Sequence, residues 1–126
     1  MVQKAAAEGY TIIFLTGRPA AQEAATLGNL EKVGYPAPSA LPEATEGGGS
    51  DGIFTKPALA DYASYLAARC GTGVSCNTDE YKSATRKYIE SLGYDIVANV
   101  GDQYSDMSGG YEDRAFKLPN PSYFLP

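Results

Sequence analysis

The chain has 126 residues, 44% hydrophobic and 20% charged, so it has room for one domain with a modest core. Its net charge is −5 and it contains no basic cluster, which argues against partners such as nucleic acid or an anionic membrane. No apolar run approaches the ~20 residues that cross a bilayer, and residues 1–10 contain no secretory signal.

The first two predicted elements are a helix over residues 2–8 and a strand over residues 11–16. A hydroxyl, a glycine and a guanidinium follow at Thr16, Gly17 and Arg18. Thr16 would lie at the carboxyl end of the strand, where it can bond a phosphoryl oxygen. Gly17 allows close approach of the backbone, and Arg18 offers a planar fork suited to phosphate. In the alternative interpretation, Thr16 only caps a strand-to-helix turn and Arg18 lies in solvent.

The middle of the chain is predicted to contain two helices and a short strand, with a loop rich in proline and glycine between the first helix and the strand. Helical periodicity and Pro/Gly content predict a helix over 19–33 that starts at Pro19, a mobile loop over 36–50, a short strand over 52–55 and a helix over 57–70. The last of these helices is expected to bury one face, made of Leu59, Tyr62, Ala63 and Leu66.

The two cysteines, Cys70 and Cys76, flank a short loop that contains two glycines. We expect them to form a disulfide, which would indicate an oxidising compartment, and two free thiols are the alternative. A metal site on these residues is not expected, because the chain contains no histidine to complete a zinc set.

A further helix is predicted over residues 79–93, capped at Asn77, Thr78 or Asp79 and closed by Gly93 in the C′ position. Lys82 would fall in its first turn, where a cation opposes the helix dipole unless an anion is close by. Taken alone, a lysine of this kind is expected on a solvated face.

Two carboxylates follow the most apolar segment of the second half. A buried strand is predicted over residues 96–100, and Gly101, Asp102 and Asp106 come directly after it. Two acidic side chains on one such loop can bind a hard cation through oxygen, and Mg²⁺ is the expected ion. The alternative is a surface loop whose aspartates only favour turns. A last edge strand is predicted over residues 114–118, and the alternation of helices and strands indicates an α/β class with a parallel sheet.

Four segments together resemble the haloacid dehalogenase (HAD) superfamily, and more closely its acid phosphatase branch, which includes plant vegetative storage proteins and secreted bacterial acid phosphatases. They are similar to three motifs of the superfamily and to an ending typical of that branch: Phe14–Arg18, Tyr81–Ser83, Gly101–Asp106 and Phe116–Pro121. Each segment alone is a weak signal, but four in the right order and spacing are specific.

The resemblance implies a Rossmann-like HAD fold and hydrolysis of small phosphomonoesters with Mg²⁺ through a phosphoaspartate. It implies a catalytic and phosphate-binding role for Thr16 and Lys82, phosphate contacts from Gly17 and Arg18, and metal binding by Asp102 with Asp106 as a ligand or support. Lys87 is a rival to Lys82, but the Tyr-Lys-Ser context favours Lys82. Secretion of the complete protein is also implied.

The chain departs from the family at its beginning. The resembled enzymes carry their nucleophile in an Asp-x-Asp motif on a central strand, but no Asp precedes Thr16 here and Glu8 is the sole acid in that stretch. We therefore interpret the chain as the C-terminal part of a longer phosphatase that is inactive alone. Without that central strand, either the 11–16 and 96–100 strands pair directly, or another chain fills the gap, or the chain is marginally stable or a homo-oligomer.

Two other functions compete with the phosphatase. One is a non-catalytic storage-type or phosphate-binding pseudoenzyme, which the missing nucleophile favours. The other is a response-regulator-like receiver, which fits worse because a receiver needs its phosphorylated Asp early in the chain. The sequence does not name a substrate.

Overall fold

A computed structural model describes residues 1–119, and the chain divides into one compact unit over Met1–Asp61 and a second that starts at Tyr62. Each unit pairs two parallel strands beside helices, so the predicted α/β class is confirmed. Asn120 and Pro121, which belong to the fourth segment of the resemblance, lie outside the described residues.

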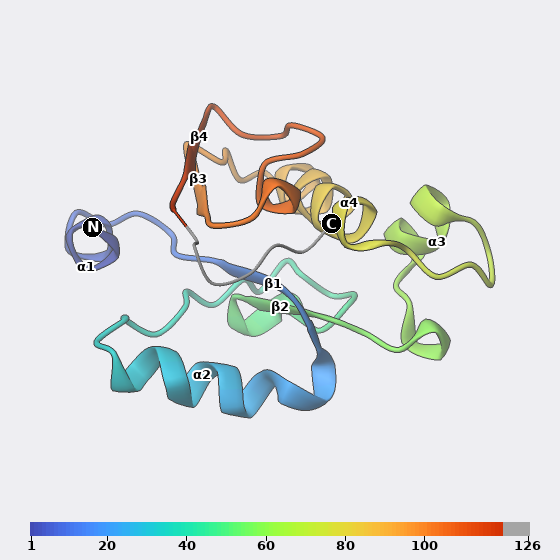
Figure 1. Ribbon diagram of the computed structural model, residues 1–126, viewed down its shortest axis with the longest axis horizontal. Helices are drawn as coiled ribbons and strands as arrows, with labels where there is room; N and C mark the ends of the chain where they lie inside the picture. Colours follow the sequence, from blue (N-terminus) through green and yellow to red (C-terminus); the bar gives the residue numbers. More distant parts are fainter. Residues whose placement is uncertain (120–126) are drawn as a thin grey trace. The chain divides into compact units, whose positions relative to one another are not determined.

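The first unit is built around the parallel pair β1 (Phe14–Pro19) and β2 (Ile53–Lys56). Phe14 pairs with Ile53 and Leu15 with Phe54, and the register then shifts before Pro19. Parallel neighbours need a long crossover, which here runs through α2 (Figure 1). Its other elements are α1 (Val2–Ala7), the 3₁₀ turns η1 (Ala20–Gln22), η2 (Gly49–Asp51) and η3 (Leu59–Asp61), and α2 (Glu23–Lys32).

The core of the first unit lies around β2. Three successive residues of β2 are buried, as expected for a parallel strand covered on both faces. The segment 36–50, predicted as a mobile loop, contributes fully buried Leu41 to this core, and the Leu41 N–H donates to the Ser50 carbonyl at 2.7 Å. This loop therefore packs as part of the unit, with no helix or strand before Gly49.

Two predicted boundaries in the first unit were wrong. The strand begins at Phe14 rather than residue 11, because Ile12 exchanges hydrogen bonds with Ser39: its N–H donates to Oγ and its carbonyl accepts from the Ser39 N–H, each at 2.8 Å. The helix predicted from Pro19 begins at Glu23, since Pro19 is extended at the end of β1 and a 3₁₀ turn follows.

The second unit packs α3 (Ser64–Cys70) against α4 (Thr78–Ser91). The rings of Tyr65 and Tyr88 stack between these helices with centroids 4.3 Å apart. Cys70 and Cys76 are joined by a disulfide with a Cα–Cα distance of 5.4 Å, which ties the end of α3 to the segment before α4. Asn77 caps α4 in a reciprocal capping box with Glu80.

The single helix predicted over 57–70 was wrong. The chain forms the short turn η3, then becomes extended at Ala63 with ψ of 160°, and α3 starts only at Ser64. Leu66 and Ala63 are buried as predicted, but Leu59 is 43% exposed, because it lies in the turn and not on the helix.

The second parallel pair is β3 (Ala98–Gly101) with β4 (Arg114–Lys117), which pair without a break in register. β3 begins two residues later than predicted, although the Ile96 and Val97 carbonyls already accept hydrogen bonds from the N–H groups of Asp113 and Arg114. The crossover over 102–113 contains the 3₁₀ turn η4 (Tyr104–Asp106), which packs on α4 (Figure 1).

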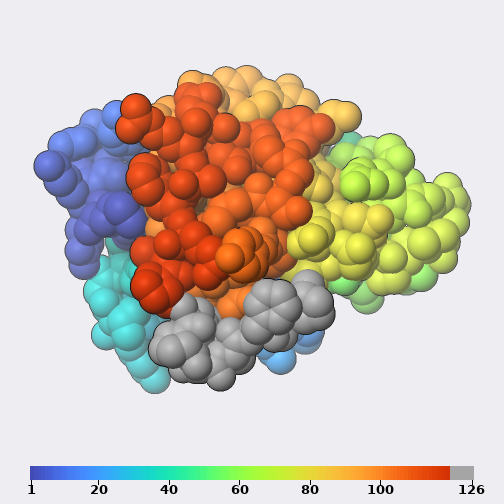
Figure 2. Space-filling view, turned by 45° about the horizontal axis from the view of Figure 1, so that its top comes forward, coloured from blue at the N-terminus to red at the C-terminus, as the bar shows by residue number. Residues whose placement is uncertain are grey.

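β3, this crossover and β4 form one contiguous surface, coloured orange to red in Figure 2. β1 and β3 belong to separate two-stranded sheets, so the direct pairing considered from the sequence does not occur. Within residues 1–119, no helix combines the length and the apolar character that a membrane span requires.

Candidate active site

The crossover that follows β3 begins with a close approach between Gly101 and Asp106. A Cβ atom on Gly101 would overlap the Asp106 carboxylate, so only glycine fits at this position. The η4 turn brings Asp106 back over the end of β3, while half-buried Asp102 follows Gly101 directly. The Gly-Asp-x-x-x-Asp pattern therefore folds as one compact turn at the end of β3.

Lys82 and Asp106 form a buried ion pair. The ammonium Nζ lies 2.5 Å from Oδ1 of Asp106, and their side chains are only 8% and 15% exposed. Nζ also donates to the hydroxyl of buried Ser105 at 3.1 Å. The expectation of a solvated Lys82 was wrong, because the carboxylate supplies the anion that offsets its burial. Lys82 is also the fifth residue of α4, beyond the first turn.

The rival cation on the same helix, Lys87, has a different environment. Lys87 is exposed, whereas each of the six residues from Tyr81 to Arg86 is buried. The sequence context that favoured Lys82 therefore agrees with the burial of the two side chains.

Asp106 is held by more than Lys82. Its Oδ2 accepts from the Gln103 N–H at 2.9 Å, and the Gln103 side chain reciprocates in a capping box around η4. Its carbonyl accepts from the Asn99 amide and from Arg86 Nη1, the latter at 2.7 Å. Sequence reasoning missed Asn99, Gln103 and Arg86. The available signal was the spacing of Arg86, one helical turn after Lys82 on the same face.

Arg86 brings a second charge into the buried region and pairs with Glu112, whose Oε2 lies 3.3 Å from Nε. Burial lowers the pKa of Arg86, while Glu112, Asp106 and Asp79 oppose the change by charge attraction. Burial also raises the pKa of Glu112, and Arg86 opposes that change. Both directions reflect the cost of removing charges from water, which the surrounding hydrogen bonds must offset.

In the first unit, Thr16, Gly17 and Arg18 lie where the regular pairing of β1 with β2 has just ended. The Thr16 hydroxyl accepts a hydrogen bond from the Arg18 N–H at 3.2 Å, and Arg18 is exposed. Both features agree with the alternative interpretation, in which Thr16 caps a turn and Arg18 lies in solvent. The accepting hydroxyl still keeps its own O–H, which can donate to an anion.

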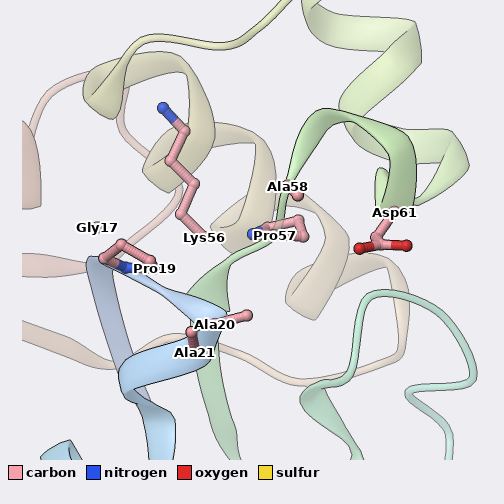
Figure 3. Close-up of a pocket in the computed structure, with 8 residues that line it drawn as sticks. All are labelled: Gly17, Pro19, Ala20, Ala21, Lys56, Pro57, Ala58 and Asp61. Carbon is pink, nitrogen blue, oxygen red and sulfur yellow. The ribbon is translucent and has the colours of Figure 1, made fainter.

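A cavity of about 400 Å³ opens beside this motif at the carboxyl ends of β1 and β2. Its floor is apolar, and Lys56 extends away from Ala20 and Ala21, with Asp61 on the far side of Pro57 (Figure 3). The carboxyl ends of parallel strands are where open α/β sheets bind ligands. The position and the mainly apolar lining suit a small organic group.

The structure assigns the predicted site residues to two sets. Lys82, Asp102 and Asp106 belong to the second unit, where Lys82 and Asp106 are in contact, and Thr16, Gly17 and Arg18 belong to the first. Among the described residues, the potential metal-ligand group Cys70, Cys76 and Glu80 is not a metal site, because the two sulfurs are bonded to each other.

Comparison with known proteins identifies the family. The model of the HAD superfamily, subfamily IIIB (acid phosphatase), matches residues 1–126. The chain belongs to this family. The resemblance inferred from the four sequence segments is thereby confirmed.

Curated relatives of this member of the family are plant proteins. It is 35% identical over 119 residues to the stem 28 kDa glycoprotein of Glycine max, covering 93% of this chain and 37% of that protein. It is 50% identical over 46 residues to vegetative storage protein 2 of Arabidopsis thaliana and 48% identical over 46 residues to acid phosphatase 1 of Solanum lycopersicum. These two matches cover 36% of this chain and 17% and 18% of the relatives. The chain thus spans less than two fifths of the curated relatives it matches.

Proposed function

We propose that the chain supplies the phosphate-binding and Mg²⁺-supporting residues of an acid phosphatase that hydrolyses small phosphomonoesters. The observation that carries the proposal is the buried pair of Lys82 and Asp106, set against the loop that starts at Asp102. A buried cation held beside an acidic loop is suited to phosphoryl transfer, in which positioning and charge neutralisation supply most of the catalysis.

Lys82 is proposed to neutralise charge on the transferring phosphoryl group. An ammonium has three N–H donors, and within the described residues two of them are directed to Ser105 Oγ and Asp106 Oδ1. The third can donate to a phosphoryl oxygen. Asp106 keeps the ammonium at one place, so little reorganisation is needed when charge develops.

The donor set fits Mg²⁺ with Asp102 as the direct protein ligand. Both carboxylate oxygens of Asp106 already accept hydrogen bonds, and one of them faces a lysine ammonium that repels a divalent cation. Asp106 is therefore proposed as a support and Asp102 as the ligand, because Mg²⁺ commonly takes one or two carboxylates and completes its shell with waters and phosphate. Bound there, the ion would neutralise phosphate charge as a Lewis acid.

Thr16 is proposed to donate its hydroxyl hydrogen to the phosphoryl group, with Gly17 permitting close approach and Arg18 as a further contact. The cavity lined by Ala20 and Ala21 is proposed to take the organic part of the substrate. Its mainly apolar lining supports this role, since small-molecule sites combine apolar walls with a few polar groups.

The nucleophile of the proposed reaction lies outside this sequence. No aspartate precedes Thr16, so the phosphoaspartate would form on an Asp-x-Asp motif of a longer chain. We propose that the 126-residue chain alone does not turn over substrate but still binds inorganic phosphate with Mg²⁺. The unpaired edges of its two small sheets are proposed to favour homo-oligomers.

The decisive test is titration of the chain with inorganic phosphate, with and without Mg²⁺, followed by NMR at the amides of Asp102 and Gln103. We expect phosphate binding that strengthens with Mg²⁺ and is lost in Lys82→Met. Asp102→Asn should abolish the Mg²⁺ effect, while Lys87→Met is the matched control that leaves both unchanged. The proposal would be rejected if phosphate binding were unchanged in Lys82→Met and its dependence on Mg²⁺ were unchanged in Asp102→Asn.

A non-catalytic storage-type or phosphate-binding protein is the second candidate, because curated relatives include two proteins named vegetative storage proteins. Intact mass and N-terminal sequencing of the protein from its natural source separate the two. A longer chain that carries Asp-x-Asp supports the phosphatase, and a native chain beginning at Met1 supports the non-catalytic role. Phosphatase turnover that is lost in Asp102→Ala would reject the non-catalytic role.

An extracellular location is proposed for the complete protein. The disulfide between Cys70 and Cys76 requires an oxidising compartment, and the soybean relatives are named glycoproteins. The proposed ligand is a small phosphomonoester, with no nucleic acid or membrane partner, in keeping with a net charge of −5.

A further inference from the structure

Arg86 is a buried side chain near the candidate site that makes several hydrogen bonds. It is only 2% exposed, and each of its three nitrogens donates to a different backbone carbonyl of the crossover. Nη1 donates to Asp106 at 2.7 Å, Nε to Gly110 at 2.8 Å, and Nη2 to Ser108. The accepting carbonyls belong to every second residue between 106 and 110, so the crossover curves around the planar guanidinium of Arg86.

The bonded crossover includes one residue, Tyr111, whose backbone conformation is not favoured by local preference. Gly109, Gly110 and Tyr111 all have positive φ, at 90°, 78° and 68°, and Tyr111 is the one non-glycine residue with positive φ in the described chain. A Cβ atom on Gly109 would lie 2.6 Å from the Cβ of Ser83, so the loop is pressed directly on α4. Such conformations persist where the surroundings over-determine them, and the Arg86 guanidinium supplies three of the bonds that do so.

The same bonds reach the candidate site through Asp106. Arg86 fixes the Asp106 carbonyl, while Lys82 and the Gln103 N–H fix its carboxylate. Lys82 and Arg86 are four residues apart on α4, so one rigid helix holds both the side chain and the backbone of Asp106. Displacing the backbone at Asp106 would move the partner of Lys82 and the loop that carries Asp102.

We propose that Arg86 is a positioning residue that sets Asp106, and through it Lys82 and Asp102, in place for Mg²⁺ and phosphate. This proposal rests on the proposed function of the site. Arg86 does not itself contact phosphate, because its donors are directed to the crossover and its charge is paired with Glu112. A lysine cannot replace it, since a point charge on a flexible stem lacks the planar fork that meets three carbonyls at once.

The test compares Arg86→Lys with Ile89→Val, a control that alters a buried residue of the same helix whose aliphatic side chain donates no hydrogen bond to the crossover. The first readout needs no metal: amide hydrogen exchange at Gln103, whose N–H donates to Asp106. We expect exchange at Gln103 to accelerate at least ~10-fold in Arg86→Lys beyond any change in global unfolding, and not in Ile89→Val. Unchanged exchange at Gln103 in Arg86→Lys overturns the proposal.

The second readout is the dissociation constant for Mn²⁺, used as a paramagnetic stand-in for Mg²⁺, from line broadening at Asp102. Arg86→Lys should weaken Mn²⁺ binding by ~10-fold or more, the usual effect of losing a group that orients a ligand, and Ile89→Val should not. Equal Mn²⁺ binding by wild type and Arg86→Lys overturns the proposal. A third outcome separates the two proposals. If exchange at Gln103 is faster in Arg86→Lys but the wild-type chain binds no Mn²⁺, the positioning role of Arg86 stands and the proposed function is rejected.

A measurement on the wild-type chain keeps the proposal testable if Arg86→Lys does not fold. A guanidinium bonded to three carbonyls cannot rotate freely, so the Nη protons of Arg86 should give separate, slowly exchanging NMR signals. The exposed guanidinium of Arg18 is the internal control and should give averaged signals. Averaged, rapidly exchanging Arg86 signals would contradict the proposed role.

Discussion

Replacing Lys82 by methionine tests how much the buried ion pair with Asp106 contributes to the free energy of unfolding. The substitution keeps much of the stem but removes the ammonium, and it leaves an Asp106 carboxylate whose side chain is only 15% exposed. Breaking a buried pair by removing one partner typically costs 3–5 kcal/mol. Asp106 retains the Gln103 N–H, so we expect the lower end, about 3 kcal/mol of unfolding free energy.

The measurement is urea unfolding followed by tyrosine fluorescence, which suits a chain with ten tyrosines and no tryptophan. A double-mutant cycle with Asp106→Asn isolates the pair, and we expect the double variant to be about 2 kcal/mol more stable than the sum of the single losses. The coupling should persist at high salt, because buried pairs are screened little. Lys87→Met, an exposed control on the same helix, should change stability by less than about 0.5 kcal/mol.

A loss in Lys82→Met equal to that in Lys87→Met would refute the reasoning, because it would mean that Lys82 is hydrated in solution. A coupling energy near zero with Asp106→Asn would refute it in a different way. It would show that the loss came from packing of the lysine stem and not from the charge pair.

Three further predictions concern other parts of the molecule. Gly101→Ala should destabilise by about 1–3 kcal/mol and weaken Mg²⁺ binding, since the new methyl group overlaps Asp106; urea unfolding and metal titration measure both, and unchanged values would reject the close approach. Asp95 has a pKa raised above 3.8, chiefly by the charge of Asp113, so its stabilising contribution is present below pH 3.8 and lost as pH rises through the raised value. Asp95→Asn should therefore be slightly more stable than wild type at pH 7, with the difference vanishing near pH 3.8, and a variant less stable at pH 7 contradicts the sign. Ala20→Leu should fill the cavity and weaken binding of phenyl phosphate but not of inorganic phosphate, and equal loss for both ligands would place the organic group elsewhere.

Local sequence signals were sufficient for the ends of several elements. Gly9, Gly34 and Gly93 follow α1, α2 and α4 with positive φ, as expected for glycines that close helices. Capping chemistry near Asn77 was also predictable, because it depends on a few neighbouring residues. These features depend on local backbone geometry, which is why a single sequence predicts them.

Long-range contacts explain where the prediction failed. Residues 11–13 read as strand, yet Ile12 bonds to Ser39, a partner that no local pattern identifies. The stretch 57–70 has helical periodicity throughout, but an extended residue at Ala63 divides it. Leu41 was assigned to a mobile loop because of its Pro/Gly-rich neighbours, although it is fully buried. In each case the tertiary partner outweighs the intrinsic propensity.

The sequence by itself determined the α/β class, the family and the acidic loop after β3, because apolar strands, glycine-bounded helices and short motifs are local patterns. Only the tertiary structure decided that Lys82 is buried against Asp106 and that Arg86 holds the crossover. The physical reason is that burying a charge is unfavourable without partners, and the partners of both cations lie about twenty residues further along the chain, beyond the reach of helical or strand periodicity.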